Sequence, residues 1–480
     1  MKNSTTRTDH QTTLEAVESR LVENKDDPAL LFQQACLLAS LGRIDEAKQA
    51  YLKLLSADQT HLGALNNLGA ILYGTGYRSA AKTVYTQAVT HHPENAMAYV
   101  NLANLLFDEN DMVSSRRHYE EALRADPDQA EAHQGLTRIF SAMRDEAGVQ
   151  RHRERGFRHR AVTTLPYFGK GPPIQLLLLV AAEGGNIPLR QNIDNRIFMT
   201  TAVFADFYDV KKPLPPHQLV FNSIGDADLC GTALEAAAVL LENTSAPVIN
   251  PPDKIIPTTR VEIARRLAPI SGVRTPETGQ LKKNALINRK IHDLQFPLLL
   301  RAPGFHTGQH FLKVDELPQL SQAIAQLPGE DVLVMQYLDA RGSDGLARKY
   351  RVMMIDGKFY PLHLAVSRDW KVHYFTADMS AQPQYREEEK KFLEDMPAVL
   401  GKKAMAALEQ IKDVLGLDYG GIDFGLDTER SILLFEANAT MVINPPLPQE
   451  PETCRSIAIE KAAQALRNML QSRALKRESI

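Results

Sequence analysis

The chain has 480 residues, which at roughly 150 residues per domain allows about three compact units. Apolar residues make up 44% and charged residues 24%, which excludes a disordered, collagen-like or low-complexity protein. The formal net charge of −3 provides no basic field, which argues against nucleic acid or an anionic membrane as a partner. Three widely separated cysteines, Cys36, Cys230 and Cys454, favour a reduced compartment over a disulfide framework or a zinc site.

Signals for export or membrane insertion are also missing from the sequence pattern. Residues 1–11 are polar and lack the apolar segment of a signal peptide. The longest apolar run, residues 176–182, is shorter than the about 20 residues that a membrane-spanning helix needs. The sequence therefore predicts a soluble, cytoplasmic, multidomain protein.

The N-terminal third of the chain is periodic. Tyr51, Tyr85 and Tyr119 are each 34 residues apart, and Ala47 and Ala81 keep the same spacing. A 34-residue period with an aromatic and a small residue at fixed places resembles the tetratricopeptide repeat. The resemblance implies pairs of antiparallel helices, with repeats that begin near residues 28, 62 and 96.

A partner for this repeat stack follows from the resemblance. Helical segments at residues 14–22 and 133–140 are expected to cap the stack. Tetratricopeptide stacks usually bind extended peptides in a concave groove, so a peptide or protein partner is implied. Asn67 and Asn101 occupy equivalent places and either contact a peptide backbone or are ordinary repeat positions. The arginine-rich helix predicted over residues 144–160 is interpreted as a solvated capping face rather than a contact for an acidic partner.

A different kind of chain begins after the repeats. The period ends around residues 161–173, and the glycine- and proline-containing segment 166–173 is predicted to be a linker. Short apolar runs then alternate with helical segments, which is typical of α/β or α+β architecture. The predicted strands are residues 174–180, 219–222, 247–250, 296–300 and 332–335.

A β-hairpin is predicted over residues 420–438, where apolar alternations flank a turn-like segment. With the turn centred between residues 429 and 430, one face carries only apolar residues. These are Ile422, Phe424 and Leu426 on the first strand and Leu433, Phe435 and Ala437 on the second. The other face places Asp423 opposite Glu436, with Asn438 next along. Opposed carboxylates about 5 Å apart repel unless a cation lies between them. Three oxygen ligands suit magnesium, and a solvated strand face is the alternative.

The spacing of these three residues resembles the metal site of the ATP-grasp superfamily. Glu436 lies thirteen positions after Asp423, and Asn438 two positions further. The superfamily includes D-alanine–D-alanine ligase, glutathione synthetase and the RimK-type ligases. The resemblance implies that Asp423, Glu436 and Asn438 bind magnesium ions that bridge the ATP phosphates. It also implies that ATP activates a carboxylate as an acyl phosphate, from which an amine then displaces phosphate.

Further nucleotide contacts follow from the same resemblance. Arg260 and Arg301 stand where lysine commonly contacts phosphate, and arginine can make bidentate phosphate contacts. The loop after Arg301 is expected to fold over the phosphates through Gly304, Thr307 and Gly308. The segment after the strand at 332–335 is expected to bind the adenine through Gln336, Tyr337 and Leu338. Asp339 or Asp344 is expected to bind the ribose.

Arg351 and Arg301 are the predicted catalytic residues, because the resemblance places Arg351 near the transferred phosphate or the acyl group. Arg351 lies in a hairpin predicted around residues 356–357, where it is expected to pair near Leu362 while Pro361 interrupts the ladder.

Substrate contacts are expected in two further segments. The Gly-Gly loop after the strand at 174–180 implicates Glu183 and Asn186. Trp370 and His373 either line the substrate pocket or serve plain packing.

The predicted fold is multidomain, an all-α helical-repeat solenoid followed by an α+β ATP-grasp fold with a preATP-grasp α/β subdomain. The predicted boundaries are 1–165 for the repeats with caps, 166–173 for the linker, 174–258 for the preATP-grasp subdomain, 259–335 for the small lobe, 336–472 for the large lobe with the magnesium site and 473–480 for the tail. The predicted function is an ATP- and magnesium-dependent carboxylate–amine ligase whose repeats recruit a peptide or protein. The alternatives are an ATP-grasp phosphotransferase and a repeat scaffold with a degenerate nucleotide-binding domain.

Overall fold

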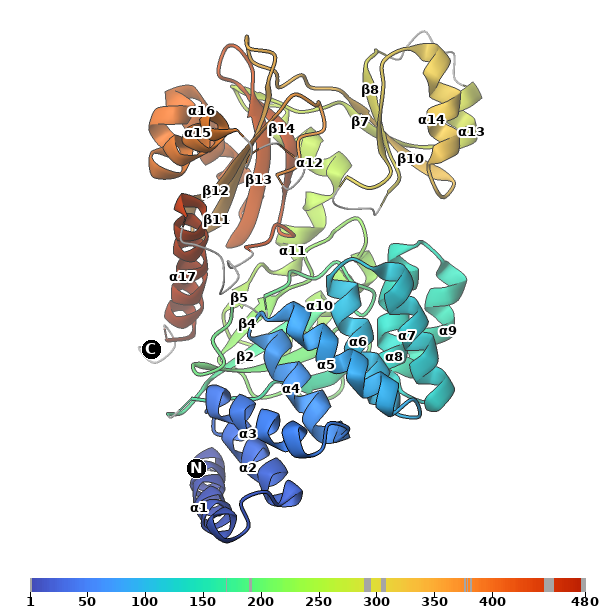
Figure 1. Cartoon of the computed structure of the whole chain (residues 1–480). Helices are drawn as coiled ribbons and strands as arrows, with labels where there is room; N and C mark the ends of the chain where they lie inside the picture. Colours follow the sequence, from blue (N-terminus) through green and yellow to red (C-terminus); the bar gives the residue numbers. More distant parts are fainter. Residues whose placement is uncertain are drawn as a thin grey trace. The chain divides into compact units, whose positions relative to one another are not determined.

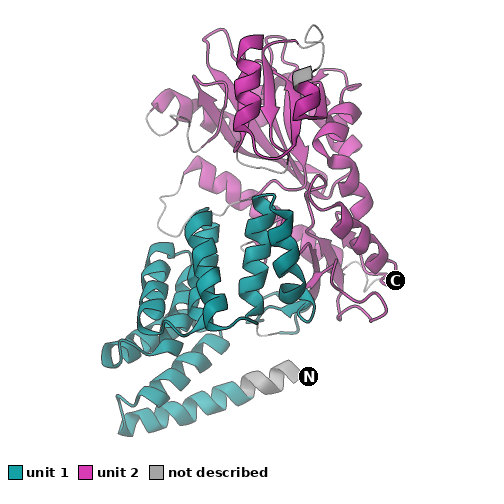
Figure 2. Ribbon diagram, turned by 90° about the vertical axis from the view of Figure 1, so that its right-hand side faces the viewer, with its two compact units in different colours: residues 1–174, 195–201, 447–449 teal, residues 175–194, 202–446, 450–480 magenta. Residues whose placement is uncertain are grey.

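The computed structural model describes residues 2–169, 171–189, 192–288, 295–303, 308–374, 377, 379, 382–443 and 453–475 (Figure 1). The chain divides into two compact units (Figure 2). Unit 1 comprises residues 1–174, 195–201 and 447–449, and unit 2 comprises residues 175–194, 202–446 and 450–480. No helix among the described residues is long and apolar enough to cross a membrane.

Unit 1 is a helical solenoid of the tetratricopeptide type. Its helices are α1 (Lys2–Glu23), α2 (Pro28–Ser40), α3 (Ile44–Ala57), α4 (Leu62–Gly74), α5 (Arg78–His91), α6 (Ala96–Asp108), α7 (Met112–Ala125), α8 (Ala130–Ala142) and α9 (Glu146–Phe157). The first helix of successive pairs begins at residues 28, 62 and 96, as the 34-residue period predicted. Asp27 illustrates why a helix begins there, because its carboxylate accepts hydrogen bonds from the backbone N–H groups of Ala29 and Leu30.

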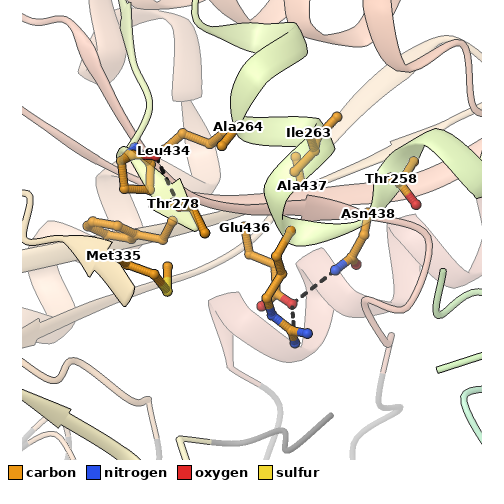
Figure 3. Close-up of a pocket in the computed structure, with 12 residues that line it drawn as sticks. Thr258, Ile263, Ala264, Thr278, Met335, Leu434, Glu436, Ala437 and Asn438 are labelled. Carbon is orange, nitrogen blue, oxygen red and sulfur yellow. Dashed lines mark hydrogen bonds and ion pairs between the residues drawn. The ribbon is translucent and has the colours of Figure 1, made fainter. Parts of the chain in front are cut away.

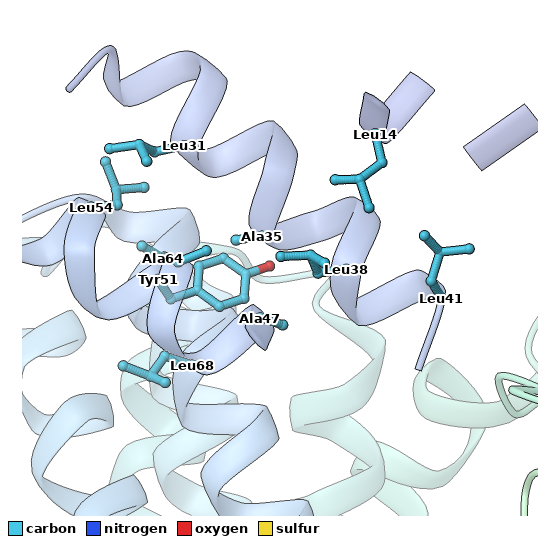
Figure 4. Packing of buried hydrophobic residues seen from close by; sticks show 11 residues of the cluster. Leu14, Leu31, Ala35, Leu38, Leu41, Ala47, Tyr51, Leu54, Ala64 and Leu68 are labelled. Carbon is cyan, nitrogen blue, oxygen red and sulfur yellow. The ribbon is translucent and has the colours of Figure 1, made fainter. Parts of the chain in front are cut away.

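The recurring tyrosine positions are packing positions between helices, as Tyr51 illustrates. Tyr51 lies at the centre of an apolar cluster that joins α1 to α4, and Leu14 of α1 packs into the same cluster (Figure 4). Asn67 donates to the Tyr51 hydroxyl over 3.0 Å, and Asn101 donates to Asn66 Oδ1 over 3.1 Å. The amide groups of Asn67 and Asn101, considered above as peptide contacts, therefore also hold neighbouring helices together.

A buried histidine pair joins the last two helices of the solenoid. His133 of α8 and His152 of α9 are 2% and 9% exposed, and their Nδ1 atoms are 2.8 Å apart. Phe140 stacks against His152 with ring centroids 5.6 Å apart. Burial and then the neighbouring His133 lower the pKa of His152 to about 4, so the pair shares its hydrogen bond in the uncharged form.

Unit 2 is a mixed α/β region with three groups of paired strands. Strands β2 (Ile174–Val180), β4 (Leu219–Asn222) and β5 (Val248–Ile249) pair in parallel. Strand β1 (Val162–Thr164) and the first residues of β3 (Phe198–Phe204) belong to unit 1, and unit 2 continues with α10 (Gly231–Leu241), α11 (Pro252–Ile255) and α12 (Arg260–Leu267). Short buried runs of leucine and valine suit strands covered on both faces.

A four-stranded antiparallel sheet follows, in the order β7-β10-β8-β9. Its elements are β7 (Thr278–Lys282), α13 (Lys283–Asn288), β8 (Leu298–Arg301), β9 (Phe311–Val314), α14 (Leu320–Gln326) and β10 (Asp331–Gln336). One face packs on α13 and α14 through leucine, valine and isoleucine side chains.

The last sheet has the order β12-β11-β13-β14-β6 and carries the candidate site. Its elements are β6 (Val273–Arg274), β11 (Ala347–Ile355), β12 (Lys358–Ser367), β13 (Tyr419–Leu426) and β14 (Ile432–Asn438). The accompanying helices are α15 (Pro383–Glu394), α16 (Met396–Leu415) and α17 (Cys454–Leu475). Helices α15 and α17 pack against β12.

The predicted register of the β13–β14 hairpin is correct at one end and wrong at the other. Asp423 pairs with Glu436 and Gly421 pairs with Asn438, as predicted. A bulge between residues 423 and 424 then places Leu434, rather than Phe435, opposite Phe424. Gly425 accommodates the bulge, because a Cβ there would lie 2.6 Å from Ala340 Cβ and 3.0 Å from Phe435 Cζ of the extra residue.

A second bulge interrupts the β11–β12 hairpin. Val352 pairs with Pro361, so proline does disturb the ladder there, but Arg351 pairs with His363 rather than near Leu362 as predicted. The extra residue on β12 is Leu362, which is 4% exposed and so is driven into the core rather than the paired row. The correction matters because it places a histidine beside Arg351.

Candidate active site

Four titratable side chains occupy matching positions on four adjacent strands. His363 of β12 pairs with Arg351 of β11, Arg351 with Asp423 of β13, and Asp423 with Glu436 of β14. Directly paired residues project from the same face of a sheet, so these four form one row. We call them the charged row.

Asp423 is the buried centre of the charged row, at 3% exposure. Its oxygens accept hydrogen bonds from Arg351 Nε and Nη2 over 2.6 and 2.7 Å and from Lys349 Nζ over 3.1 Å. Burial alone would raise the pKa of Asp423, but the charges of Arg351 and Lys349 outweigh burial and hold it well below its usual range. Asp423 is therefore ionised at neutral pH.

Glu436 lies at the other end of the row, against different cations. Its Oε1 is 3.6 Å from Arg260 Nη2 and accepts a hydrogen bond from Asn438 Nδ2 over 2.9 Å. The amide oxygen of Asn438 accepts in turn from the backbone N–H and hydroxyl of Thr440. The two opposed carboxylates are thus offset by cationic side chains of the protein, a solution that the hairpin pattern alone did not reveal.

Two arginines from separate segments meet near Glu436. Arg260 is the first residue of α12 and pairs with Asp228 over 3.0 Å, whereas Arg301 is the last residue of β8. Burial, then the charge of Arg260, lower the pKa of Arg301 to about 10, so Arg301 remains cationic at neutral pH. Burial also raises the pKa of Asp228, against the opposing effect of Arg260.

A partly open pocket lies beside these residues, and its empty space of about 360 Å³ includes open solvent (Figure 3). Its floor is largely apolar, with Ile263 of α12, Met335 of β10 and Leu434 of β14. Its polar edge consists of Arg260, Glu436 and Asn438. Arg260 and Asn438 also line a smaller adjoining pocket, together with Asp228. An apolar floor with convergent polar groups at one edge suits a ligand with a flat apolar part and a charged part.

The donor set fits magnesium in part. Glu436 presents hard carboxylate oxygens to the pocket edge, and such donors suit this ion, whereas the amide oxygen of Asn438 already accepts two hydrogen bonds from Thr440. Asp423 has the right chemistry, but its oxygens face Arg351 and Lys349. Within the described ranges no group of three or more His, Cys, Asp or Glu side chains is arranged to bind a metal. Magnesium at Glu436 and Asn438 therefore stays a prediction.

The expected nucleotide loop and hinge are described only in part. Gly304 and Thr307 lie outside the described residues, whereas Gly308 has a φ of +73°, a backbone conformation that favours glycine. Gln336 is the last residue of β10 and Tyr337 and Leu338 follow it, but it is the preceding Met335 that lines the pocket. Their contact with adenine stays a prediction.

The four expected substrate residues are divided between packing and the neighbourhood of the site. The Asn186 amide donates to and accepts from the backbone of Ala181, so it shapes its own loop, and Glu183 lies in the same loop, half-buried. Trp370 packs edge-on against Phe311 with ring centroids 5.4 Å apart. Burial and then the charge of Lys349 lower the pKa of His373, which therefore lies near the charged row.

Sequence reasoning missed several residues of this region. Lys349 shares an alternating strand face with Arg351, and that spacing was the available signal. Glu389 lies within the charged run at residues 387–391, yet it is 6% exposed and accepts a hydrogen bond from Tyr374 over 3.1 Å. Burial raises the pKa of Glu389 to about 7. Nothing in the sequence pattern marked Asp228.

Comparisons with known proteins bear on the first unit. Family models described as tetratricopeptide repeat match residues 28–61 and 72–130. One similar solved structure is MamA from Desulfovibrio magneticus RS-1, from residue 41 to its end. The two chains are 22% identical over a match that covers 32% of this chain and 88% of MamA, and the TM-score is 0.29. PilF of Pseudomonas aeruginosa is 17% identical over a match that covers 32% of this chain and 70% of PilF, and its TM-score is 0.30.

No curated protein matches the chain. The assignment of unit 1 rests on the family models and the helix boundaries and not on these structural similarities. The N-terminal region of this chain, within residues 28–130, carries tetratricopeptide repeats.

Proposed function

We propose that this protein is an ATP- and magnesium-dependent ligase that joins a carboxylate to an amine. The observation that carries the proposal is the pocket edge formed by Arg260, Glu436 and Asn438, with Arg301 close enough to interact with the charges of Arg260 and Glu436, next to a charged row that continues to Arg351. Two partly buried cations and a carboxylate beside an apolar pocket suit a nucleotide with a polyphosphate chain and its metal ion.

The chain's own residues would act mainly by positioning and by offsetting charge. Arg260 and Arg301 would bind phosphate oxygens, and their partial burial strengthens the electrostatic attraction. Glu436 and Asn438 would hold magnesium, which when bound neutralises phosphate charge. Arg351, fixed by its fork of hydrogen bonds to Asp423, would stabilise negative charge on the reacting group.

The reaction balances without a covalent protein intermediate. A substrate carboxylate attacks the terminal phosphorus of ATP, so that a carboxylate–phosphate bond forms as the bond to ADP breaks. The amine then attacks the acyl carbon, inorganic phosphate leaves, and the amine loses its proton to solvent. For unit 1 we propose that the repeat groove recruits a peptide or protein that carries the carboxylate or the amine.

The test measures nucleotide binding through the thermal unfolding of the full chain. Trp370, the single tryptophan, lies in unit 2 and so reports the unfolding of that unit by fluorescence. Mg-ATP at about a hundred times its dissociation constant should stabilise unit 2 by roughly 2.7 kcal/mol, and the shift should need magnesium. Glu436→Gln and Arg301→Ala should reduce the shift, whereas Glu429→Gln, in the exposed turn of the same hairpin, should not.

Two outcomes would count against the proposal. An unchanged unfolding temperature of the wild type at millimolar Mg-ATP would favour the repeat scaffold with a degenerate nucleotide-binding domain. A shift that persists in both variants would place the nucleotide elsewhere.

A further inference from the structure

Around Asp423, the cations Lys349 and Arg351 outnumber the carboxylate that they share. Lys349 and Arg351 both face the single carboxylate of Asp423. The Asp423 side chain is 4% exposed, whereas the side chains of Lys349 and Arg351 are 15% and 25% exposed. The carboxylate is therefore enclosed, and the two cations keep an accessible side.

Hydrogen-bond capacity leads to the same conclusion. A lysine ammonium has three N–H donors and an arginine guanidinium has five. Lys349 donates once and Arg351 twice to Asp423, and within the described part of the chain no other acceptor is found for either side chain. Most donors of this pair are thus available to a ligand, while Asp423 keeps both side chains in place.

The groups behind the pair do not cancel its charge. His363 pairs with Arg351 in the ladder, and among the described residues its buried Nε2 has no hydrogen-bond partner. Burial and then the charge of Arg351 hold the pKa of His363 well below its usual range, so the imidazole is neutral. The nearby carboxyl of Glu389 already accepts from the Tyr374 hydroxyl and from the backbone N–H of Leu364.

We infer that Lys349 and Arg351 form an oxyanion subsite on the face of the charged row, and that Lys349 is its second anchor beside Arg351. The ligand class is a phosphoryl group, because the row leads from the pocket edge at Glu436 directly to this pair. A substrate carboxylate shares the same oxyanion chemistry. The inference rests on the proposed function and deepens it, since the subsite would receive the group transferred from the nucleotide. Lys349 lies outside every motif that carries the resemblance.

The experiment titrates inorganic phosphate against the full chain, with and without saturating Mg-ADP, and follows unfolding through Trp370 fluorescence. Sodium acetate is the carboxylate probe, and sodium chloride controls for ionic strength. The variants are Lys349→Met, Lys349→Gln and Lys349→Arg. Lys358→Met is the matched control, because Lys358 is exposed at the turn of the same hairpin.

Phosphate should raise the unfolding temperature of the wild type. Lys349→Met and Lys349→Gln should need roughly tenfold more phosphate for the same shift, as expected for the loss of one charged hydrogen bond. Lys349→Arg should recover part of the response, and Lys358→Met should match the wild type. Equal phosphate responses in the wild type and both neutral variants would overturn the inference.

The arms separate this inference from the proposed function. A wild type that responds to phosphate through Lys349, but not to Mg-ADP, keeps the subsite and removes the nucleotide site. A wild type that responds to Mg-ADP, with a phosphate response that does not depend on Lys349, keeps the nucleotide site and removes the subsite. A Lys349-dependent response to acetate but not to phosphate would overturn the phosphoryl assignment in favour of a substrate carboxylate. If one neutral variant fails to fold, the other and Lys349→Arg still decide the result.

Discussion

Removing Arg351 should destabilise unit 2 because it leaves a buried charge poorly paired. Asp423 is 3% exposed and receives two hydrogen bonds from Arg351, so Arg351→Met leaves it with Lys349 alone. Breaking a buried ion pair by deleting one partner costs about 3–5 kcal/mol. Since Lys349 remains 3.1 Å away, we expect a value near the lower end, about 3 kcal/mol.

Urea unfolding followed through Trp370 measures this loss in unit 2. Arg341→Met is the matched control, because Arg341 pairs with Asp339 where both side chains are 50% and 43% exposed. An exposed pair contributes about 0–1 kcal/mol, so this variant should be close to the wild type. Asp423→Asn combined with Arg351→Met should cost less than the sum of the single changes, by roughly 0.5–3 kcal/mol.

The pH dependence supplies an internal check. The pKa of Asp423 is lowered in the folded state, so its contribution is present above the ordinary value of 3.8 and is lost as pH falls below it. The difference between the wild type and Arg351→Met should therefore shrink in acid. A loss below about 1 kcal/mol at neutral pH, equal to that of Arg341→Met, would refute the assignment of Arg351 as the partner of a buried charge.

Three further predictions concern stability. His152 has a folded pKa of about 4 against an ordinary 6.5, so unit 1 should lose up to about 3 kcal/mol as pH falls from 6.5 to 4, and His152→Asn should flatten that dependence in circular dichroism melts. Glu389 has a pKa of about 7 in the folded protein against an ordinary value of 4.5, so the stability of unit 2 should fall as pH rises from 4.5 to 7. Glu389→Gln should remove this pH dependence in urea unfolding followed through Trp370, and an unchanged pH dependence would contradict the burial of Glu389 as its cause. A Cβ at Gly135 would lie 2.1 Å from Tyr119 Cζ, so Gly135→Ala should lower the free energy of unfolding by about 1–3 kcal/mol. Gly74 has open space around it, so Gly74→Ala should be neutral or stabilising, and thermal melts of the two variants test both expectations.

Local pattern was sufficient to predict much of the fold. The 34-residue period located the starts of α2, α4 and α6, because helix pairs of constant length place equivalent residues at constant spacing. Alternation and apolar runs located β2, β4 and β10, and the pairing of Asp423 with Glu436. These features depend on residues close together in the sequence.

The remainder depends on contacts between distant segments. The two bulges arise from the packing of Phe435 and Leu362, which period-two alternation does not encode. Lys349 and Arg351 contact Asp423 across more than seventy residues of chain. Arg260 likewise contacts Asp228, which lies in the loop that follows β4. Burial of Glu389 likewise depends on how α15 packs against β12.

The bulges at Leu362 and Phe435 bracket the charged row from opposite sides. One lies between residues 351 and 352 on the pairing with β12, and the other between residues 423 and 424 on the pairing with β14. Each outer strand therefore changes the phase of its alternation next to the row. Deleting either bulge residue would restore a regular ladder on one side and turn every side chain beyond it to the opposite face. Single-residue length variation at these two points is thus a direct way to move His363 or Glu436 out of the row while the central pair of strands stays in register.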